Sequence, residues 1–335
     1  MRYLKCEAYR EDIETTIAHT VNFDVFGNKS VLVLGASGLI GSFIVDCFLY
    51  ADEKYDAGIT VYAAGRSAGR LKSRFGGERE GCLHFIEADV TDMNLDVPFD
   101  FMIHAASYGH PQAFREVPVE VFLSNVIGTD RVMRMAGKTG KCRVLYISSG
   151  EAQEEVDHLT SRACYPMGKR AAETLCISYN KEYGVDVVIA RPSHTFGANV
   201  TGNDNRATAQ FIALASAEKN IEMYSTGEQL RSFSYVADCV SGLLTVLTSG
   251  ESGQVYGISS GESCTVRAFA EVCAELGGSR VELHLPSSTE MAETSPIKEQ
   301  IVDNSGLKAL EWQAAFSIRE GIRKSLQIIK EMGGI

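Results

Sequence analysis

Three glycines at fixed spacing constrain this chain more than any other feature. Residues 30–35 form an apolar run typical of a buried parallel strand and lead into Gly35-Ala-Ser-Gly38-Leu-Ile-Gly41. The next residues, 39–50, carry apolar side chains at helical spacing and predict a helix. In such a strand–turn–helix unit Gly35 permits the tight turn, Gly38 lets the backbone approach a pyrophosphate, and Gly41 lets the helix pack closely on the strand.

The glycine turn therefore predicts a dinucleotide site at the start of the helix. Free N–H groups and the positive end of the helix dipole would face the phosphates there. A turn that needs glycine only for packing is the alternative interpretation. The residues expected to contact the cofactor, NAD or NADP, are Gly35, Ser37, Gly38, Leu39, Ile40 and Gly41.

Apolar runs alternate with helical patterns along the first part of the chain. This alternation predicts an α/β fold, a doubly wound parallel sheet of the Rossmann type with a smaller C-terminal substrate-binding α/β domain. The expected strands are residues 30–35, 59–63, 83–87, 101–104, 144–148 and 185–190, with helices over 39–50 and 119–135.

Three segments are predicted along the chain. Residues 1–28 form an N-terminal helical extension, with Ile13, Ile17 and Val21 at helical spacing. Residues 29–190 form the dinucleotide-binding domain. Residues 191–335 mainly form the substrate-binding domain, with about 235–258 returning to the first domain.

Composition excludes several classes of function. The net charge of −11 argues against nucleic-acid binding, which needs a basic surface. Nine cysteines without a Cys-x-x-Cys pair predict reduced thiols and neither a metal site nor a disulfide framework. No apolar run approaches the roughly 20 residues of a membrane span, and the charged N-terminus does not resemble a secretory signal. We therefore expect a cytoplasmic protein with no membrane partner.

The end of the second strand bears on the choice between NAD and NADP. NAD sites carry Asp or Glu there, but here the strand runs into Gly65-Arg66-Ser67. Arg66 can pair with a 2′-phosphate, although a solvated loop arginine is a fair alternative. Asp89 and Val90 follow the third strand, where adenine is expected.

One of two Tyr-x-x-x-Lys pairs predicts catalysis. Tyr50 and Lys54 close the first helix, away from the carboxyl edge of the sheet. Tyr165 and Lys169 follow the strand 144–148, whose end carries Ser148 and Ser149, and their spacing places both side chains on one helix face. An ammonium beside the phenol, together with a bound cationic nicotinamide, would stabilise the phenolate and lower the pKa of Tyr165, so that it takes a proton from a sugar hydroxyl. A core tyrosine with an exposed lysine is the alternative.

Further motifs carry a resemblance over about residues 29–330. The chain resembles the extended short-chain dehydrogenase/reductases, in their NAD-dependent epimerase/dehydratase branch, and within it UDP-glucuronate decarboxylases. The motifs are His104-Ala-Ala-Ser107, Asn125-Val-Ile-Gly-Thr129, residues 162–174, Arg191-Pro192 through Gly197, residues 202–206, residues 223–231 and residues 231–238.

The resemblance implies roles for individual residues. The catalytic set would be Ser149, Tyr165, Lys169 and Glu151. Ala105, Ala106, Asn125, Tyr165 and Lys169 would contact the cofactor, with Arg66, Asp89 and Val90. Ser107, His194, Arg206, Tyr224 and Arg231 would hold a nucleotide-sugar substrate. The resemblance also implies a homodimer through the helix after Glu116 and the helix of Tyr165, with Val121, Phe122, Val126 and Ile127 on more than one face.

Reactions of this branch start with oxidation of the sugar at C4, and the next step differs. Ser149-Gly150-Glu151 lacks the acid of the 4,6-dehydratases at Gly150, which favours decarboxylation over dehydration. Departures from the decarboxylase pattern at His194, Gln210 and Lys298 leave 4-epimerisation, dehydration and net oxidoreduction open. A catalytically silent NAD(P)-binding scaffold or sensor is the non-enzymatic alternative.

Overall fold

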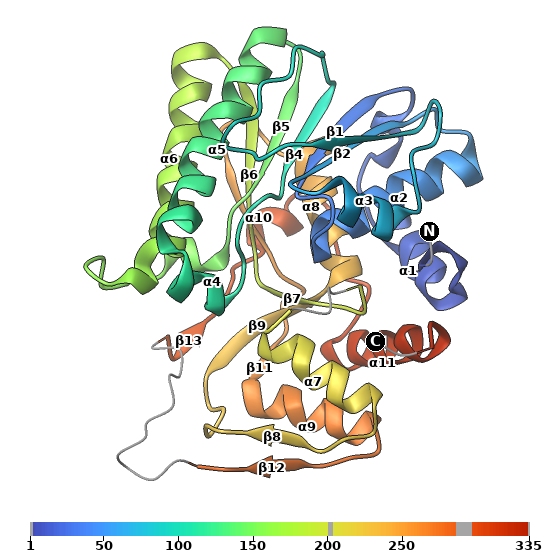
Figure 1. The fold of residues 1–335 in the computed structure, drawn as a ribbon, viewed down its shortest axis with the longest axis vertical. Helices are drawn as coiled ribbons and strands as arrows, with labels where there is room; N and C mark the ends of the chain where they lie inside the picture. Colours follow the sequence, from blue (N-terminus) through green and yellow to red (C-terminus); the bar gives the residue numbers. More distant parts are fainter. Residues whose placement is uncertain (1–2, 200–203, 286–296, 334–335) are drawn as a thin grey trace.

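A computed structural model describes residues 3–199, 204–285 and 297–333. Its centre is a sheet of seven parallel strands in the order β10-β6-β5-β4-β1-β2-β3 (Figure 1). The strands are β1 (Ser30–Leu34), β2 (Thr60–Gly65), β3 (Leu83–Glu87), β4 (Phe101–His104), β5 (Arg143–Ile147), β6 (Asp186–Pro192) and β10 (Val255–Ile258). The predicted doubly wound sheet is confirmed.

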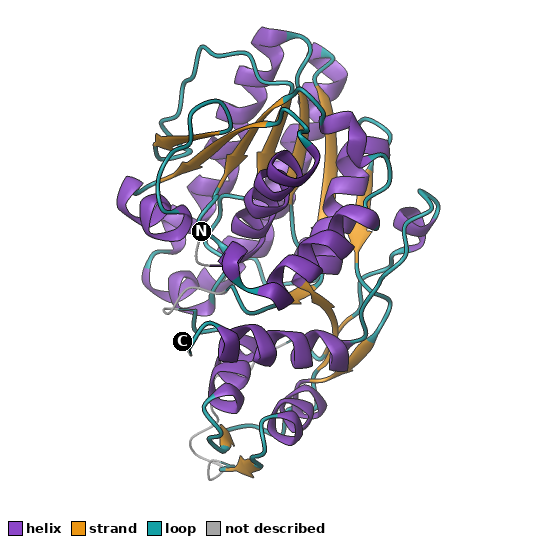
Figure 2. Ribbon diagram, turned by 90° about the vertical axis from the view of Figure 1, so that its right-hand side faces the viewer, coloured by secondary structure: helices purple, strands orange, loops and turns teal. Residues whose placement is uncertain are grey.

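Helices cover both faces of this sheet, which explains why its strands are apolar throughout (Figure 2). Along β1, Val31 and Val33 belong to one hydrophobic cluster and Leu32 and Leu34 to the other. The first cluster includes side chains of α1 (Glu7–Ala18), α2 (Leu39–Tyr55), α3 (Ala68–Phe75) and α8 (Val236–Ser249). The second includes side chains of α5 (Pro118–Thr139) and α6 (Cys164–Tyr183).

Smaller sheets lie beyond the carboxyl edge of the large one (Figure 1). β9 (Leu230–Tyr235) pairs with β7 (His194–Phe196), β11 (Ser263–Thr265) and β13 (Glu299–Gln300), and β8 (Ile221–Met223) pairs with β12 (Val281–Leu283). The helices of this part are α7 (Ala207–Ser216), α9 (Val266–Leu276) and α11 (Ile318–Glu331). The short helix α4 (Pro111–Glu116) lies between β4 and α5, and the short helix α10 (Ser305–Lys308) lies between β13 and α11.

The N-terminal helix α1 (Glu7–Ala18) packs against α2, α8 and α11 and so touches both parts of the molecule. Asp12 accepts a hydrogen bond of 2.5 Å from the Tyr235 hydroxyl, and the Lys324 ammonium lies 3.1 Å from its carboxylate. α1 ends at Ala18, so it contains Ile13 and Ile17 of the predicted spacing but not Val21. The Val21 backbone N–H donates instead to a threonine side chain of α8.

The predicted domain bounds stay a prediction. β6 runs on to Pro192, beyond the expected change at residue 190, and α8 and β10 lie on the large sheet. Gly202 and Asn203, part of the stretch 202–206, lie outside the described residues.

Three further predictions concern the cysteines, the discounted Tyr-x-x-x-Lys pair and membrane spans. All nine cysteines are free thiols, and six of them are buried. Tyr50 and Lys54, the discounted pair, both hydrogen-bond Glu14 of α1. Among the described residues, the longest helices are too polar or too short to span a bilayer.

Candidate active site

A cavity of about 570 Å³ opens at the carboxyl ends of β1, β2 and β4. This is the point where the strand order reverses, the usual ligand site of an open parallel sheet. Its lining includes eight of the predicted cofactor residues and Ser107, which we assigned to the substrate. The eight are Gly35, Ser37, Gly38, Arg66, Asp89, Val90, Ala105 and Ala106.

The glycine turn has the geometry of a phosphate cradle. Gly35 adopts φ +79°, and a Cβ there would lie 2.8 Å from the backbone of Ala105. At Gly41 a Cβ would lie 2.4 Å from the Gly35 carbonyl oxygen, so this glycine serves close packing of α2 on the turn. At Gly38, the N-cap of α2, a Cβ would meet only that same carbonyl oxygen at 3.4 Å. The cradle therefore opens on the cavity and suits a dinucleotide pyrophosphate.

Other predicted cofactor residues lie behind the cavity lining. Leu39, Ile40 and Gly41 are in the first turn of α2, where Leu39 and Gly41 are buried. Asn125 of α5 is fully buried, accepts a hydrogen bond of 3.1 Å from the Ser107 hydroxyl and donates to the Val121 carbonyl. Asn125 thus holds Ser107 in place at the cavity wall.

Tyr165 stands in the first turn of α6, beside the carboxyl end of β5. Its ring stacks on Phe114 with centroids 4.7 Å apart. Burial raises the pKa of the Tyr165 phenol to about 12, opposed by a hydrogen bond from the Ser149 side chain and by the positive charges of Arg206 and Arg162. These groups converge on the phenol from β5, the start of α7 and the turn before α6, so the predicted serine and tyrosine are brought together.

Lys169 lies one turn along α6, as the spacing predicted, but it is 3% exposed. Its ammonium donates to the Ile147 carbonyl at 2.7 Å and lies 5.9 Å from the centroid of the Tyr165 ring. Burial lowers the pKa of Lys169 to about 7, partly offset by the charge of Glu173. In the protein without its cofactor the pKa of Tyr165 is raised, chiefly by burial, whereas the sequence predicted a lowered pKa with the cofactor bound.

Sequence reasoning missed the buried carboxylate of Glu173. It accepts hydrogen bonds from the Ser148 hydroxyl at 2.5 Å and from Arg191 at 2.9 and 2.6 Å. Tyr165, Lys169 and Glu173 recur at four-residue intervals, so the same helical spacing could have revealed it. This network ties α6 to the ends of β5 and β6.

The predicted active-site glutamate, Glu151, is ion-paired. The Arg162 guanidinium donates to its carboxylate at 2.7 Å, and the Ser149 hydroxyl accepts the Glu151 backbone N–H at 3.2 Å. The negative charge of Glu151 also raises the pKa of Tyr165. Glu151 therefore belongs to the same cluster as the phenol.

Three predicted substrate residues face this cluster from the smaller part of the molecule: His194 in β7, Arg231 in β9 and Arg206 just before α7. The half-buried His194 of β7 has its pKa lowered to about 3 by burial and by the charges of Arg231 and Arg206, so it is neutral at pH 7. Arg206 is ion-paired with Asp204, with contacts of 2.5 to 3.1 Å. Arg231 is 4% exposed and donates to backbone carbonyls of residues 297 and 298.

Tyr224, the fourth predicted substrate residue outside the cavity, has other neighbours. It is 58% exposed, donates a hydrogen bond of 2.6 Å to Glu222 and packs beside the His284 ring. These contacts place it on the pair β8 and β12, at the far end of the smaller part.

The glycine between Ser149 and Glu151 lies against a closed surface. A Cβ on Gly150 would lie 2.8 Å from Val302 Cγ2 and 3.8 Å from the amide carbon of Gln300. Gln300 is 3% exposed, and its side chain lies near the Glu154 carboxylate. Residues distant in sequence therefore fill the space beside Gly150.

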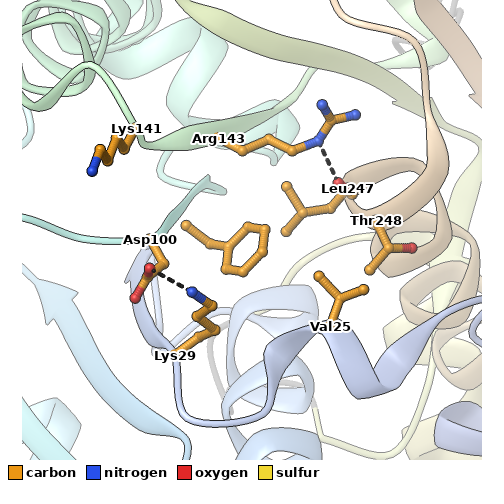
Figure 3. A pocket seen from close by; sticks show the side chains of 8 residues that line it. Val25, Lys29, Asp100, Lys141, Arg143, Leu247 and Thr248 are labelled. Carbon is orange, nitrogen blue, oxygen red and sulfur yellow. Dashed lines mark hydrogen bonds and ion pairs between the residues drawn. The ribbon is translucent and has the colours of Figure 1, made fainter.

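A second hollow, of about 250 Å³, lies at the opposite edge of the sheet (Figure 3). There Lys29 pairs with Asp100 at 3.2 Å, and Arg143 donates to the Leu247 carbonyl at 2.6 Å (Figure 3). Arg143 also bonds Asp186 and the Gly250 carbonyl, so its guanidinium caps the end of α8. The interactions of Lys29 and Arg143 therefore stabilise the fold.

The fold and the glycine cradle define a dinucleotide-binding enzyme class, and the comparisons place the chain within it. A profile of the NAD dependent epimerase/dehydratase family matches residues 31–259. The chain belongs to this family and is an NAD-dependent enzyme.

Two curated relatives are UDP-glucuronic acid decarboxylases. The zebrafish (Danio rerio) UDP-glucuronic acid decarboxylase 1 is 29% identical over 313 residues, 89% of this chain and 72% of the relative. The Arabidopsis thaliana UDP-glucuronic acid decarboxylase 6 is 30% identical over 308 residues, 88% and 87% of the two chains. Among solved structures, the Bordetella bronchiseptica enzyme WbmF in complex with NAD+ and UDP superposes with a TM-score of 0.74 at 23% identity, covering 92% of this chain and 93% of WbmF. That likeness supports the fold.

Proposed function

We propose that this enzyme acts on a nucleotide sugar and oxidises its C4 hydroxyl, with UDP-glucuronate decarboxylation as the overall reaction. The observation that carries the proposal is the convergence of Ser149, Tyr165 and Lys169 at the carboxyl end of β5, beside the cavity with the glycine cradle. The decarboxylase relatives at 29% and 30% identity support the choice of reaction.

Each residue of the site has a separate proposed role in C4 oxidation. Bound NAD supplies a hydride acceptor and a positive charge. Once ionised, the Tyr165 phenolate would take the proton of the C4 hydroxyl, with the Ser149 hydroxyl bonding the same oxygen. Lys169 would stabilise the phenolate through its charge, and the neutral His194 with Arg206 and Arg231 would orient the diphosphate.

Decarboxylation needs little more from the protein. A 4-keto uronate is a β-keto acid, so loss of CO₂ leaves an enolate that donors of the site stabilise and that must then be reprotonated at C5. Return of the hydride to C4 would then make the cycle redox-neutral. Gly150 carries no side chain and faces Val302, so a route that depends on an acid at this position is disfavoured.

A second candidate is 4-epimerisation of a neutral nucleotide sugar. The side chains nearest to Gly150, Val302 and Gln300, are uncharged, whereas a uronate carboxylate is best held by a cation. An epimerase needs only room to turn the keto sugar and return the hydride to its other face.

One experiment separates these reactions from each other and from net oxidoreduction. The NAD-loaded enzyme is incubated with UDP-glucuronate, UDP-glucose and dTDP-glucose, and products are analysed by mass and by NMR. We expect loss of CO₂ from UDP-glucuronate without net change in nicotinamide absorbance. Unchanged mass with inverted C4 identifies an epimerase, loss of water a dehydratase, and stoichiometric absorbance change a net oxidoreductase. No product from any nucleotide sugar would contradict the proposal.

We also propose a cytoplasmic homodimer. Nine unpaired thiols support a reducing compartment. On α5, the exposed fractions of Val119, Phe122, Leu123 and Ile127 run from 36% to 67%, which supports an interface along this helix, whereas Val121 is fully buried within one chain. Light scattering in solution should give twice the molar mass of one chain.

A further inference from the structure

The end of β2 lacks the group that selects NAD in this fold. A carboxylate there normally bonds the ribose 2′-hydroxyl. Here β2 ends at Gly65, a Cβ on which would contact Leu71 of α3, and Arg66 and Ser67 come next. The strand end therefore presents a cation and a hydroxyl where NAD sites present an acid.

Two arginines line the same cavity as the glycine cradle. Arg66 follows β2 directly, and Arg70 lies in the first turn of α3. Ser67 is the N-cap of α3 and accepts the Arg70 backbone N–H at 3.3 Å, so it also faces the cavity beside both arginines. A cation in the first turn of a helix opposes the helix dipole, so helix stability gives no reason for Arg70 at this place.

Arg66 is held in a defined position over the cavity. Its guanidinium carbon lies 4.5 Å from the centroid of the Tyr108 ring, and one of its nitrogens donates to the Tyr108 hydroxyl. Tyr108 follows β4 and lines the cavity from the other side of the sheet centre. A guanidinium has five N–H donors, so the bond to Tyr108 leaves donors for phosphate oxygens.

Two carboxylates lie close to these cations. Asp89 lines the cavity, but one of its oxygens accepts the backbone N–H and hydroxyl of Thr91 at 2.9 and 2.7 Å. Glu87, the last residue of β3, accepts the Ala68 backbone N–H at 3.1 Å. A phosphate bound at this end of α3 would compete with Glu87 for that donor, so we expect Glu87 to weaken anion binding there.

We infer that Arg66, Ser67 and Arg70 form a subsite for the ribose 2′-phosphate of NADP, so that the cavity accepts NADP as well as NAD. Two guanidinium groups and a hydroxyl provide charge-assisted hydrogen bonds to a dianionic phosphate. The inference concerns the cofactor and holds whichever nucleotide sugar the enzyme uses.

Binding constants of the whole protein test it without any reaction. NADPH and NADH are titrated by calorimetry into the wild type, Arg66→Ala, Arg70→Ala and the double variant. We expect NADPH to bind the wild type at least as tightly as NADH. Each single variant should weaken NADPH roughly tenfold, as loss of a charge-assisted bond implies, and change NADH far less. The matched control is Lys72→Ala, an exposed cation of α3 outside the cavity lining, which should change neither.

A smaller probe isolates the phosphate from the rest of the cofactor. Adenosine 2′,5′-bisphosphate should bind more tightly than adenosine 5′-monophosphate, and Glu87→Gln should increase this preference. The inference is overturned if NADPH binds the wild type more than about tenfold weaker than NADH, or if the arginine variants weaken both cofactors equally. It is also overturned if the bisphosphate shows no advantage over the monophosphate. None of these results depends on turnover of a sugar.

Discussion

At the scale of single residues, burial decides the protonation states around the phenol. Tyr165 has its pKa raised to about 12, Lys169 has its pKa lowered to about 7, and His194 has its pKa lowered to about 3. All three shifts come chiefly from removal of the charged form from water. The site therefore holds a neutral phenol and a neutral imidazole at pH 7, and Lys169 is the group most open to change near that pH.

Lys169 should make stability depend on pH in a specific direction. The unfolded lysine keeps its proton up to a pKa near 10.5, whereas the folded one loses it above about 7. Between these values the unfolded state binds more protons. The free energy of unfolding of the wild type should then rise with pH relative to Lys169→Met, by up to about 1.4 kcal/mol per pH unit.

Urea unfolding from pH 7 to about pH 9 measures this difference. Lys181→Met, at the exposed end of the same helix, is the control and should run parallel to the wild type. Parallel curves for Lys169→Met as well would show that the ammonium is not held in a dry environment.

At the scale of elements, α6 carries the chemistry and is fixed to the sheet by one carboxylate. Glu173 is 6% exposed and bonds both Ser148 after β5 and Arg191 in β6. The helix therefore cannot shift along the sheet without breaking charged hydrogen bonds in a buried place.

Glu173→Gln should lower the free energy of unfolding by about 2 kcal/mol, because it removes the charge that Arg191 pairs with. Glu182→Gln, exposed near the end of α6, is the matched control and should have little effect. Chemical denaturation of both variants measures the costs, and equal stability of the two would contradict an anchoring role for Glu173.

At the scale of the molecule, local sequence patterns predicted the large sheet. They could not predict those parts of the site whose residues are far apart in the sequence. The predicted ranges 83–87 and 101–104 agree with β3 and β4, because polar or turn residues bound these apolar runs. Gln300 and Val302 could not be placed beside Gly150 from sequence, since nearly half the chain separates them from it and long-range contacts such as the pairing of β13 with β9 bring them there. The ion pairs of Glu151 with Arg162 and of Arg206 with Asp204 also depend on side-chain packing that no spacing reveals.

The central claim is that Tyr165, as its phenolate, takes the proton of the sugar hydroxyl when the cofactor is bound. The most direct measurement compares turnover by the wild type, Tyr165→Phe and Tyr50→Phe on the nucleotide sugar that the wild type converts, with NAD affinity measured in parallel. Tyr50→Phe changes the other Tyr-x-x-x-Lys pair and should keep full activity. We predict that Tyr165→Phe lowers turnover by about 10²- to 10⁴-fold with NAD affinity unchanged. Wild-type turnover by Tyr165→Phe, or an equal loss in Tyr50→Phe, would contradict the account.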